Sequence, residues 1–124
     1  MFKQRVQGFA VGAATVAALM VGLPMLSSPS PDPSLDEFAE SVGVEIVWSP
    51  VTPCTVTKPQ SLGCFSLSTP DVIYVVPSSN KKNNQVVLHE LAHVMQHRLG
   101  LWLNECDADR LANTLGAHSG DYCD

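Results

Sequence analysis

Two amphipathic helices joined by a very short connection restrict most strongly how this chain can fold. From Asn84 onward, apolar residues recur at spacings of three and four, which is typical of a helix with one buried face. Gly100 is placed to end this helix, and Asn104 is placed to cap a second one. Only the five residues "GLWLN" join the two, so we expect the second helix to fold back beside the first. The apolar positions are Val87, Leu88, Leu91, Val94, Met95 and Leu99 in the first helix, and Leu111, Ala112 and Leu115 in the second.

The segment before these helices predicts one short helix and a few strands. The helix is expected over Ser34–Gly43, with Ser34 as its cap. Strands are expected over Val44–Ser49, Cys64–Ser68 and Asp71–Val76. This order predicts an α+β fold, in which a small sheet packs on an active-site helix and on the helix that follows it. Trp48 and Trp102 are most simply interpreted as core residues.

The N-terminus has the features of an export signal. Lys3 and Arg5 precede an apolar run of 18 residues, Phe9–Leu26, which is typical of a signal peptide or an uncleaved membrane anchor. The alternative is a buried core helix, which the flanking charges disfavour. The rest of the chain is therefore expected outside the cytoplasm, secreted or anchored. The predicted division is a signal peptide or anchor over residues 1–27, a Pro/Ser linker over 28–34 and a zinc metallopeptidase domain over 35–124.

Four cysteines favour two disulfides. The globular part has about 90 residues, a size that often needs covalent staples. An even number of cysteines in an exported chain is typical of disulfides. Chain order suggests Cys54–Cys64 and Cys106–Cys123, but three pairings are possible. Zinc binding by the cysteines is disfavoured, because the chain has no Cys-x-x-Cys pair.

The first of the two long helices carries a His-Glu-x-x-His pattern. His89 and His93 lie one turn apart on the same face, where two imidazoles can hold one zinc ion. Glu90 is rotated by roughly 100° from His89, so it is badly placed as a ligand but can reach a water at an open zinc position. Zinc lowers the pKa of that water toward about 7, and Glu90 can then take its proton. The alternative is a helix with two surface or hydrogen-bonded histidines.

A catalytic zinc ion needs a third protein ligand, and Glu105 is the best placed candidate. His97 is two turns from His89, roughly 12 Å along a straight helix, so it cannot reach the same ion. The five-residue connection spans on the order of 15 Å, enough to bring the start of the second helix back to the metal. Asp109, one turn after Glu105, can accept the free ring N–H of a histidine. The alternative is that both acids only favour the helix N-terminus through its dipole.

The stretches "HELAH" and "NECDADRLA" resemble the gluzincin zinc metallopeptidases, in particular small bacterial and phage-type members. The resemblance implies that His89, His93 and Glu105 bind one catalytic zinc ion. It also implies that Glu90 is the general base and that Asp109 supports a histidine. The resemblance covers about 30 residues. Only 11 residues separate His93 from Glu105, fewer than in most gluzincins, which leaves no room there for elements that shape a substrate cleft.

The same resemblance implies two further parts of a peptidase site. A strand beside the active-site helix is expected to hydrogen-bond an extended substrate, and either Asp71–Val76 or Gly63–Leu67 could be that edge strand. A strand wholly paired inside the sheet is the alternative. A group that stabilises the tetrahedral oxyanion is also expected. The candidates are Tyr74, His118 and Tyr122.

The predicted function is hydrolysis of peptide bonds in a peptide or protein substrate by an exported or membrane-anchored zinc metallopeptidase, more an endopeptidase than an exopeptidase. One alternative is a structural zinc ion that stabilises a small extracellular binding module. A second is a disulfide-stapled interaction domain without metal. The formal net charge of −5 and the lack of a basic stripe beyond Lys81 and Lys82 argue against a nucleic-acid partner. A membrane is an expected partner if the N-terminal segment is uncleaved.

Overall fold

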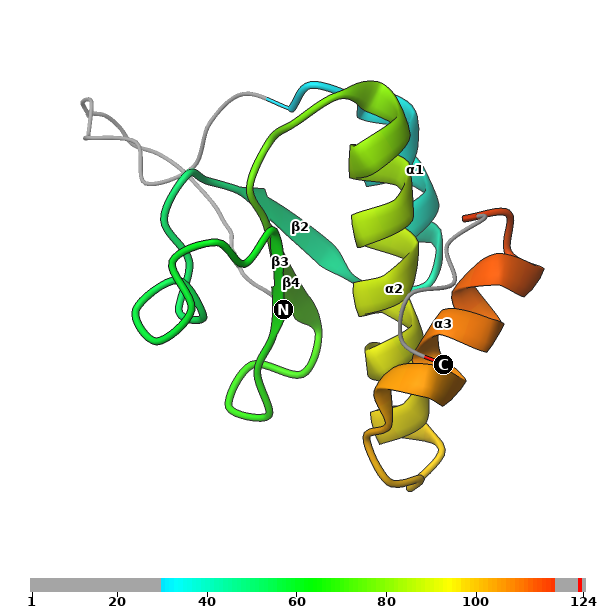
Figure 1. Ribbon diagram of the computed structural model, residues 1–124. Coiled ribbons are helices and arrows are strands. Elements are labelled where there is room, and N and C mark those ends of the chain that lie inside the picture. The colour runs from blue at the N-terminus through cyan, green and yellow to red at the C-terminus, as the bar shows by residue number, and fades with distance from the viewer. Residues whose placement is uncertain (1–29, 118–122, 124) are drawn as a thin grey trace, which may run out of the picture.

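The computed structural model describes residues 30–117 and residue 123, and these form a small α+β fold (Figure 1). The order of elements, one helix, three strands and two helices, confirms the predicted fold class. The elements are α1 (Pro33–Ser41), β2 (Glu45–Trp48), β3 (Gly63–Phe65), β4 (Val72–Val75), α2 (Asn80–Arg98) and α3 (Glu105–Thr114). None of the helices in the described residues is long and apolar enough to cross a membrane.

The sheet has the strand order β2-β4-β3. Its central strand, β4, pairs in parallel with β2 and antiparallel with β3. The expectation that Asp71–Val76 is an exposed edge is therefore wrong, because β4 is paired on both sides. A continuous apolar run is typical of such a buried strand. In the described part of the chain β3 is an edge of the sheet, as the prediction for Gly63–Leu67 requires.

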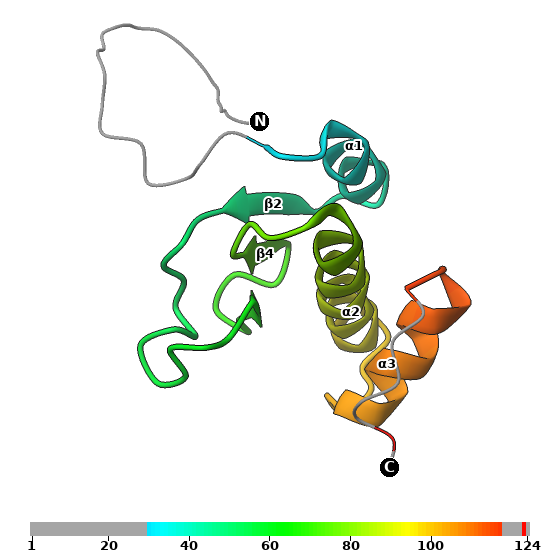
Figure 2. The same ribbon diagram turned by 45° about the horizontal axis from the view of Figure 1, so that its top comes forward.

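Helix α2 lies between the sheet and α3 (Figure 2). Side chains alternate across a strand, so residues two apart share a face. Ile73 and Val75 of β4 are fully buried in the core that also contains Val87 and Leu91 of α2. The register places Gly63 and Phe65 of β3 opposite Val75 and Ile73, so these residues share the face toward α2. The core residues are Leu35, Ala39, Val44, Trp48, Ile73, Val75, Val87, Leu88, Leu91, Val94, Ala112 and Ala117.

The helix boundaries follow from capping groups. Ser79 caps α2 by accepting a hydrogen bond from the Lys82 amide, so the helix begins before the first apolar residue of its periodic pattern. Asn104 caps α3, as predicted, by accepting from the Asp107 amide at 2.8 Å.

Helix α1 is capped by Asp32 and not by Ser34. It begins at Pro33, whose fixed φ suits the first turn of a helix.

Two disulfides are present, Cys54–Cys64 and Cys106–Cys123, and both follow chain order. The first ties the loop before β3 to that strand, and the second ties residue 123 to the first turn of α3. Disulfides of this kind are typical of proteins outside the reducing cytoplasm.

The two tryptophans differ sharply in their surroundings. Trp48 is buried, and its indole N–H donates to Asp36 at 2.9 Å. Trp102 is 90% exposed, so its interpretation as a core residue is wrong. It belongs to the α2–α3 connection, which lies at the end of α2 farthest from α1 (Figure 1). A connection this short cannot reach back to the core.

Candidate metal centre

Three side chains from α2 and α3 converge on one point. His89 and His93 lie one turn apart in the middle of α2, and Glu105 is the first residue of α3. Glu105 Oε1 is 2.8 Å from His89 Nε2 and 3.2 Å from His93 Nε2. One ligand atom from each residue lies within 4.8 Å of the others, so this group could hold a metal ion. The short α2–α3 connection therefore does bring the start of α3 back to the two histidines.

Each histidine is also held through its other ring nitrogen. His89 Nδ1 is 3.1 Å from Asp109 Oδ1, and Asp109 is 1% exposed. His93 Nδ1 is 2.9 Å from Gln96 Oε1, and Gln96 is also buried. Contacts of this kind fix the ring orientation and the tautomer of a metal-binding histidine. Both imidazoles consequently present Nε2 to Glu105.

The hydrogen-bonding capacity of this group fits a bound cation. A neutral imidazole has only one N–H, yet both ring nitrogens of His89 face a carboxylate oxygen. In the same way, His93 faces an amide oxygen and the Glu105 carboxylate. Either two extra protons or one divalent ion would satisfy Glu105. Ligand atoms on a tetrahedral zinc ion lie roughly 3.3 Å apart for bonds of ~2.0–2.1 Å, close to the distances of 2.8 and 3.2 Å from Glu105 Oε1 to the two histidines.

The surroundings of Glu105 favour a charged carboxylate. Its partial burial alone would raise its pKa, but the hydrogen bond from His89 and the charge and hydrogen bond of His93 outweigh that effect. The net result is a pKa below the usual value for glutamate. An ionised carboxylate is the form that binds a metal.

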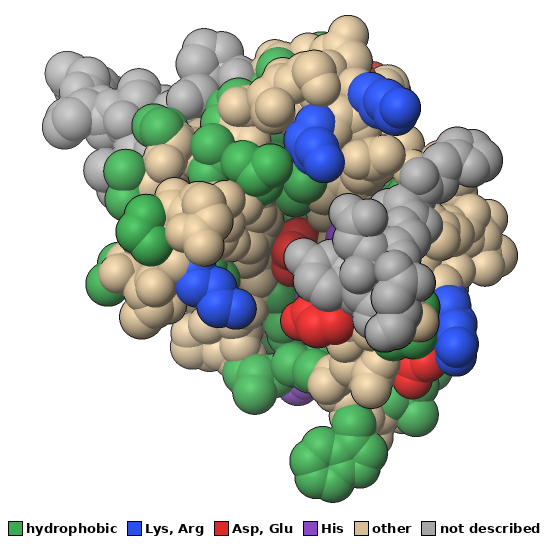
Figure 3. Space-filling model, in the orientation of Figure 1, with side chains coloured by type: hydrophobic (Ala, Val, Ile, Leu, Met, Phe, Trp, Pro, Cys, Tyr) green, Lys and Arg blue, Asp and Glu red, His purple; other side chains and the backbone are tan. Residues whose placement is uncertain are grey.

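Glu90 is a buried acid next to this group. Its side chain lies in α2, is 8% exposed, and has no hydrogen bond or ion pair within the described residues. Burial raises the pKa of Glu90 from 4.5 to about 7, against the opposing charges of His93 and His89. On the face shown in Figure 3, acidic side chains lie in a hollow between the side of the molecule that holds the sheet and the side that holds α3. A carboxyl group with a pKa near neutrality suits proton transfer.

Strand β3 forms the wall against Glu90. A Cβ atom on Gly63 would lie 2.7 Å from Glu90 Oε2 and 2.6 Å from Val86 Cγ1, closer than such atoms approach one another. Only glycine at position 63 therefore lets the strand pass this close to the carboxylate. An isolated glycine inside a strand pattern is a signal of close backbone approach, and it could have identified this contact from the sequence.

Tyr74, one of the candidate oxyanion-stabilising groups, does not lie at this point. Tyr74 lies on β4 between the core residues Ile73 and Val75, so its side chain is on the face of the sheet away from α2. Its hydroxyl group hydrogen-bonds with Thr69 at 3.3 Å. His118 and Tyr122 lie outside the described residues.

Two residues near the ligands, His97 and Gln96, do not belong to the converging group. His97 is exposed, and its ring contacts Phe65, so it is not one of the converging groups. Gln96 was not identified from the sequence, although its position three residues after His93 places both on one side of the helix. The sequence pattern holds no stronger signal for it, since a buried amide is recognised only by its partners.

The comparisons with known proteins give no relative whose site could be set beside this one. Models of known protein families, curated proteins and solved structures all give no match to this chain.

Proposed function

We propose that this protein is a small zinc-dependent peptidase that acts outside the cytoplasm. The observation that carries the proposal is the convergence of His89, His93 and Glu105 beside the buried carboxyl group of Glu90. Two imidazoles and one carboxylate are a ligand set that zinc accepts in catalytic sites with one open position. A purely structural ion would give no reason to bury Glu90, at a cost in stability, where the described residues offer it no hydrogen bond or ion pair.

The roles of the chain's own residues follow from their positions. Zinc held by the three ligands would lower the pKa of a coordinated water toward about 7 and polarise the substrate carbonyl. Glu90 then acts as the general base that takes a proton from the attacking water and delivers it to the leaving amine. A cation nearby lowers the pKa of Glu90 from its metal-free value of about 7, which favours the ionised, proton-accepting form. Asp109 and Gln96 hold the two imidazoles in place.

Strand β3 is the part of the fold best suited to bind a substrate backbone. The amide of Val76 donates to the carbonyl of Leu62, so Leu62 and Cys64 bond toward β4 while Gly63 and Phe65 alternate with them. The backbone groups of Gly63 and Phe65 therefore face the edge of the sheet that no described strand covers, where the Gly63 carbonyl accepts a hydrogen bond from the Ser61 hydroxyl at 2.8 Å. An extended peptide that pairs with this edge would lie beside β3, the strand that packs against the Glu90 carboxylate. This favours unfolded or loop segments of peptides and proteins as substrates.

The site of action follows from the cysteines and the N-terminal segment. Two disulfides are typical of an oxidising compartment. The apolar run that starts at Phe9 would export the chain and would either be removed or remain as a membrane anchor.

The decisive experiment compares metal content and peptide hydrolysis across matched variants. The full chain should bind about one zinc ion per molecule, as the one ligand group found among the described residues predicts. Glu105→Ala should weaken zinc binding by more than about 100-fold, whereas Asp107→Ala, an exposed acid in the same helical turn, should leave it unchanged. Glu90→Gln should keep zinc and lose hydrolysis of a peptide library.

Three outcomes would count against the proposal. Protein that takes up no zinc even after the metal is added back would show that the three ligands do not form a site. Equal effects of the Glu105 and Asp107 variants would remove Glu105 from the ligand set. Zinc binding without any hydrolysis by the parent protein would identify a structural ion instead.

A further inference from the structure

We propose that Gln96 is a positioning residue whose one amide group sets the tautomer of His93 and also fixes the start of α3 beside the metal. The inference rests on the proposed metal site. It concerns how two of the ligands, His93 and Glu105, are held in position relative to each other. Gln96 is only 4% exposed, and both ends of its amide are used.

Three hydrogen bonds define the orientation of this amide. Gln96 Nε2 donates to the backbone carbonyl of Asn104 at 3.0 Å, and the backbone amide of Asn104 donates to Gln96 Oε1 at 3.3 Å. A backbone carbonyl can only accept and a backbone N–H can only donate, so the amide cannot be flipped. Its oxygen is therefore the atom that lies 2.9 Å from His93 Nδ1.

The orientation of the amide settles which nitrogen of His93 carries the proton. An amide oxygen only accepts, so Nδ1 of His93 must be the N–H donor. In the neutral ring, Nε2 then keeps its lone pair and directs it to the point shared with Glu105. Gln96 thus does for His93 what Asp109 does for His89, without adding a second negative charge.

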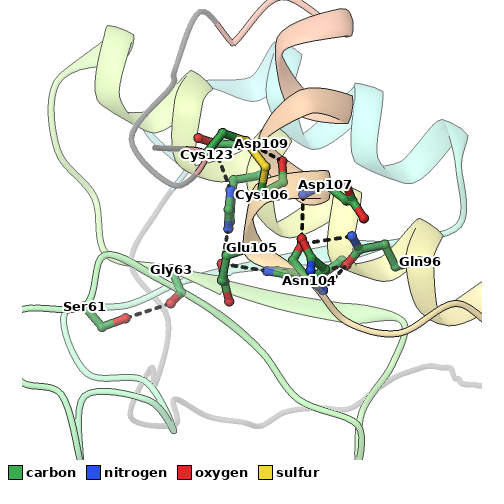
Figure 4. Close-up of polar contacts among 11 residues, drawn as sticks. Ser61, Gly63, Gln96, Asn104, Glu105, Cys106, Asp107, Asp109 and Cys123 are labelled. Atoms are coloured by element: carbon green, nitrogen blue, oxygen red, sulfur yellow. Dashed lines mark hydrogen bonds and ion pairs between the residues drawn. A yellow bond between two sulfur atoms is a disulfide. The ribbon is translucent and has the colours of Figure 1, made fainter.

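The same amide fixes the position of α3. Asn104 is the N-cap of α3, and Glu105 follows it directly, so holding the Asn104 backbone places the first turn of the helix (Figure 4). The side chains of the connection do little to anchor it, since Leu101 is 58% and Trp102 is 90% exposed. The side chain of Asn104 is already used to cap α3. Gln96 therefore links the two helices at the point where their ligands meet.

The test uses two substitutions of Gln96 and a matched control on the same helix. Gln96→Leu removes every hydrogen bond of the amide. Gln96→Glu keeps an acceptor for His93 but places an oxygen against the Asn104 carbonyl, so it separates the two roles and remains informative if the leucine variant folds poorly. Gln85→Leu makes the same change on α2, at a partly buried residue one turn before His89 that is not one of the converging groups.

Two measurements apply, and neither depends on activity. The first is zinc affinity of the full chain, measured by competition with a chelating dye. Gln96→Leu should weaken it by about 10–100-fold, the range for loss of a partner to a ligating histidine, while Gln85→Leu stays at the parent value. The second is the ring tautomer of His93 in metal-free protein, from long-range ¹H–¹⁵N NMR correlations. The parent and Gln96→Glu should carry the proton on Nδ1, and Gln96→Leu should lose this preference.

The outcomes separate this inference from the proposed function. If the parent binds no zinc, the proposed function falls, while the tautomer of His93 still tests the role of Gln96. If the parent binds zinc and Gln96→Leu binds it as tightly as Gln85→Leu does, Gln96 does not position the ligands. A proton on Nε2 of His93 in the metal-free parent would also overturn the inference.

Discussion

Replacing Glu90 by glutamine in metal-free protein should remove a large part of the pH dependence of its stability. The pKa of Glu90 is raised by burial from 4.5 to about 7, so the folded state favours the protonated carboxyl group. The stability that this group contributes is fully present below about pH 4.5, is lost as the pH rises through about 7, and stays lost above that. Glutamine has nearly the same shape and does not ionise, so the variant should lack this loss.

The size of the effect follows from the two pKa values. A rise from 4.5 to about 7 corresponds to about 3 kcal/mol, since each pKa unit is worth about 1.4 kcal/mol. Glu90 is almost fully buried, so solvent screening takes little away from this value. The free energy of unfolding of Glu90→Gln relative to the parent should therefore increase by about 3 kcal/mol between pH 4 and pH 8.

Urea unfolding in the presence of a chelator measures this difference. The fluorescence of the buried Trp48 reports unfolding, and both proteins keep their disulfides. Other titrating groups are the same in the parent and the variant, so the difference between them isolates Glu90. If that difference stays constant from pH 4 to pH 8, burial does not raise the pKa of Glu90 in the metal-free protein, and the argument that its burial prepares it for proton transfer fails.

Three further predictions concern Gly63 in β3, the Cys106–Cys123 disulfide and the exposed Trp102 in the α2–α3 connection. Gly63→Ala should slow peptide hydrolysis by about 100-fold without loss of zinc, because the new Cβ displaces the Glu90 carboxylate packed against Gly63. The control Ile73→Val shortens a core side chain and should lower the free energy of unfolding by about 0.5–1.5 kcal/mol while hydrolysis is kept. Replacing Cys106 and Cys123 together by serine should lower the free energy of unfolding by about 3 kcal/mol in urea titrations, given their sequence separation of 17. Trp102→Ser should change that free energy by less than about 0.5 kcal/mol, and acrylamide should quench the remaining tryptophan fluorescence less, because the residue removed is the exposed one.

The helical part of the molecule could be predicted because its signals are local. The spacing of Leu88, Leu91 and their neighbours identified α2, and Asn104 identified the start of α3. The beginning of α2 was placed too late, since its first turn is polar and is set by Ser79 and not by apolar periodicity. The convergence of the two helices followed from the length of their connection and the spacing of polar residues one turn apart.

The rest of the site depends on contacts that a sequence pattern does not contain. Strand order is decided by how segments pair across the sheet, so the pattern of Asp71–Val76 did not reveal that β4 is central. Trp102 was expected in the core because it is apolar, but the geometry of the connection exposes it. Gln96 has an ordinary helical position, and its contacts with the His93 ring and with the backbone of Asn104, eight residues away, appear only in the folded structure.

The candidate ligands and the wall of Glu90 come from different parts of the chain. His89, His93 and Glu105 belong to one helical hairpin, whereas Gly63 reaches Glu90 from a strand that lies well before that hairpin in the sequence. Contacts between residues close in sequence form faster than contacts between distant ones. On the proposed function, the helical hairpin alone would supply the three metal ligands together with Glu90. The sheet supplies the buried setting of Glu90, because β3 packs against its carboxylate at Gly63.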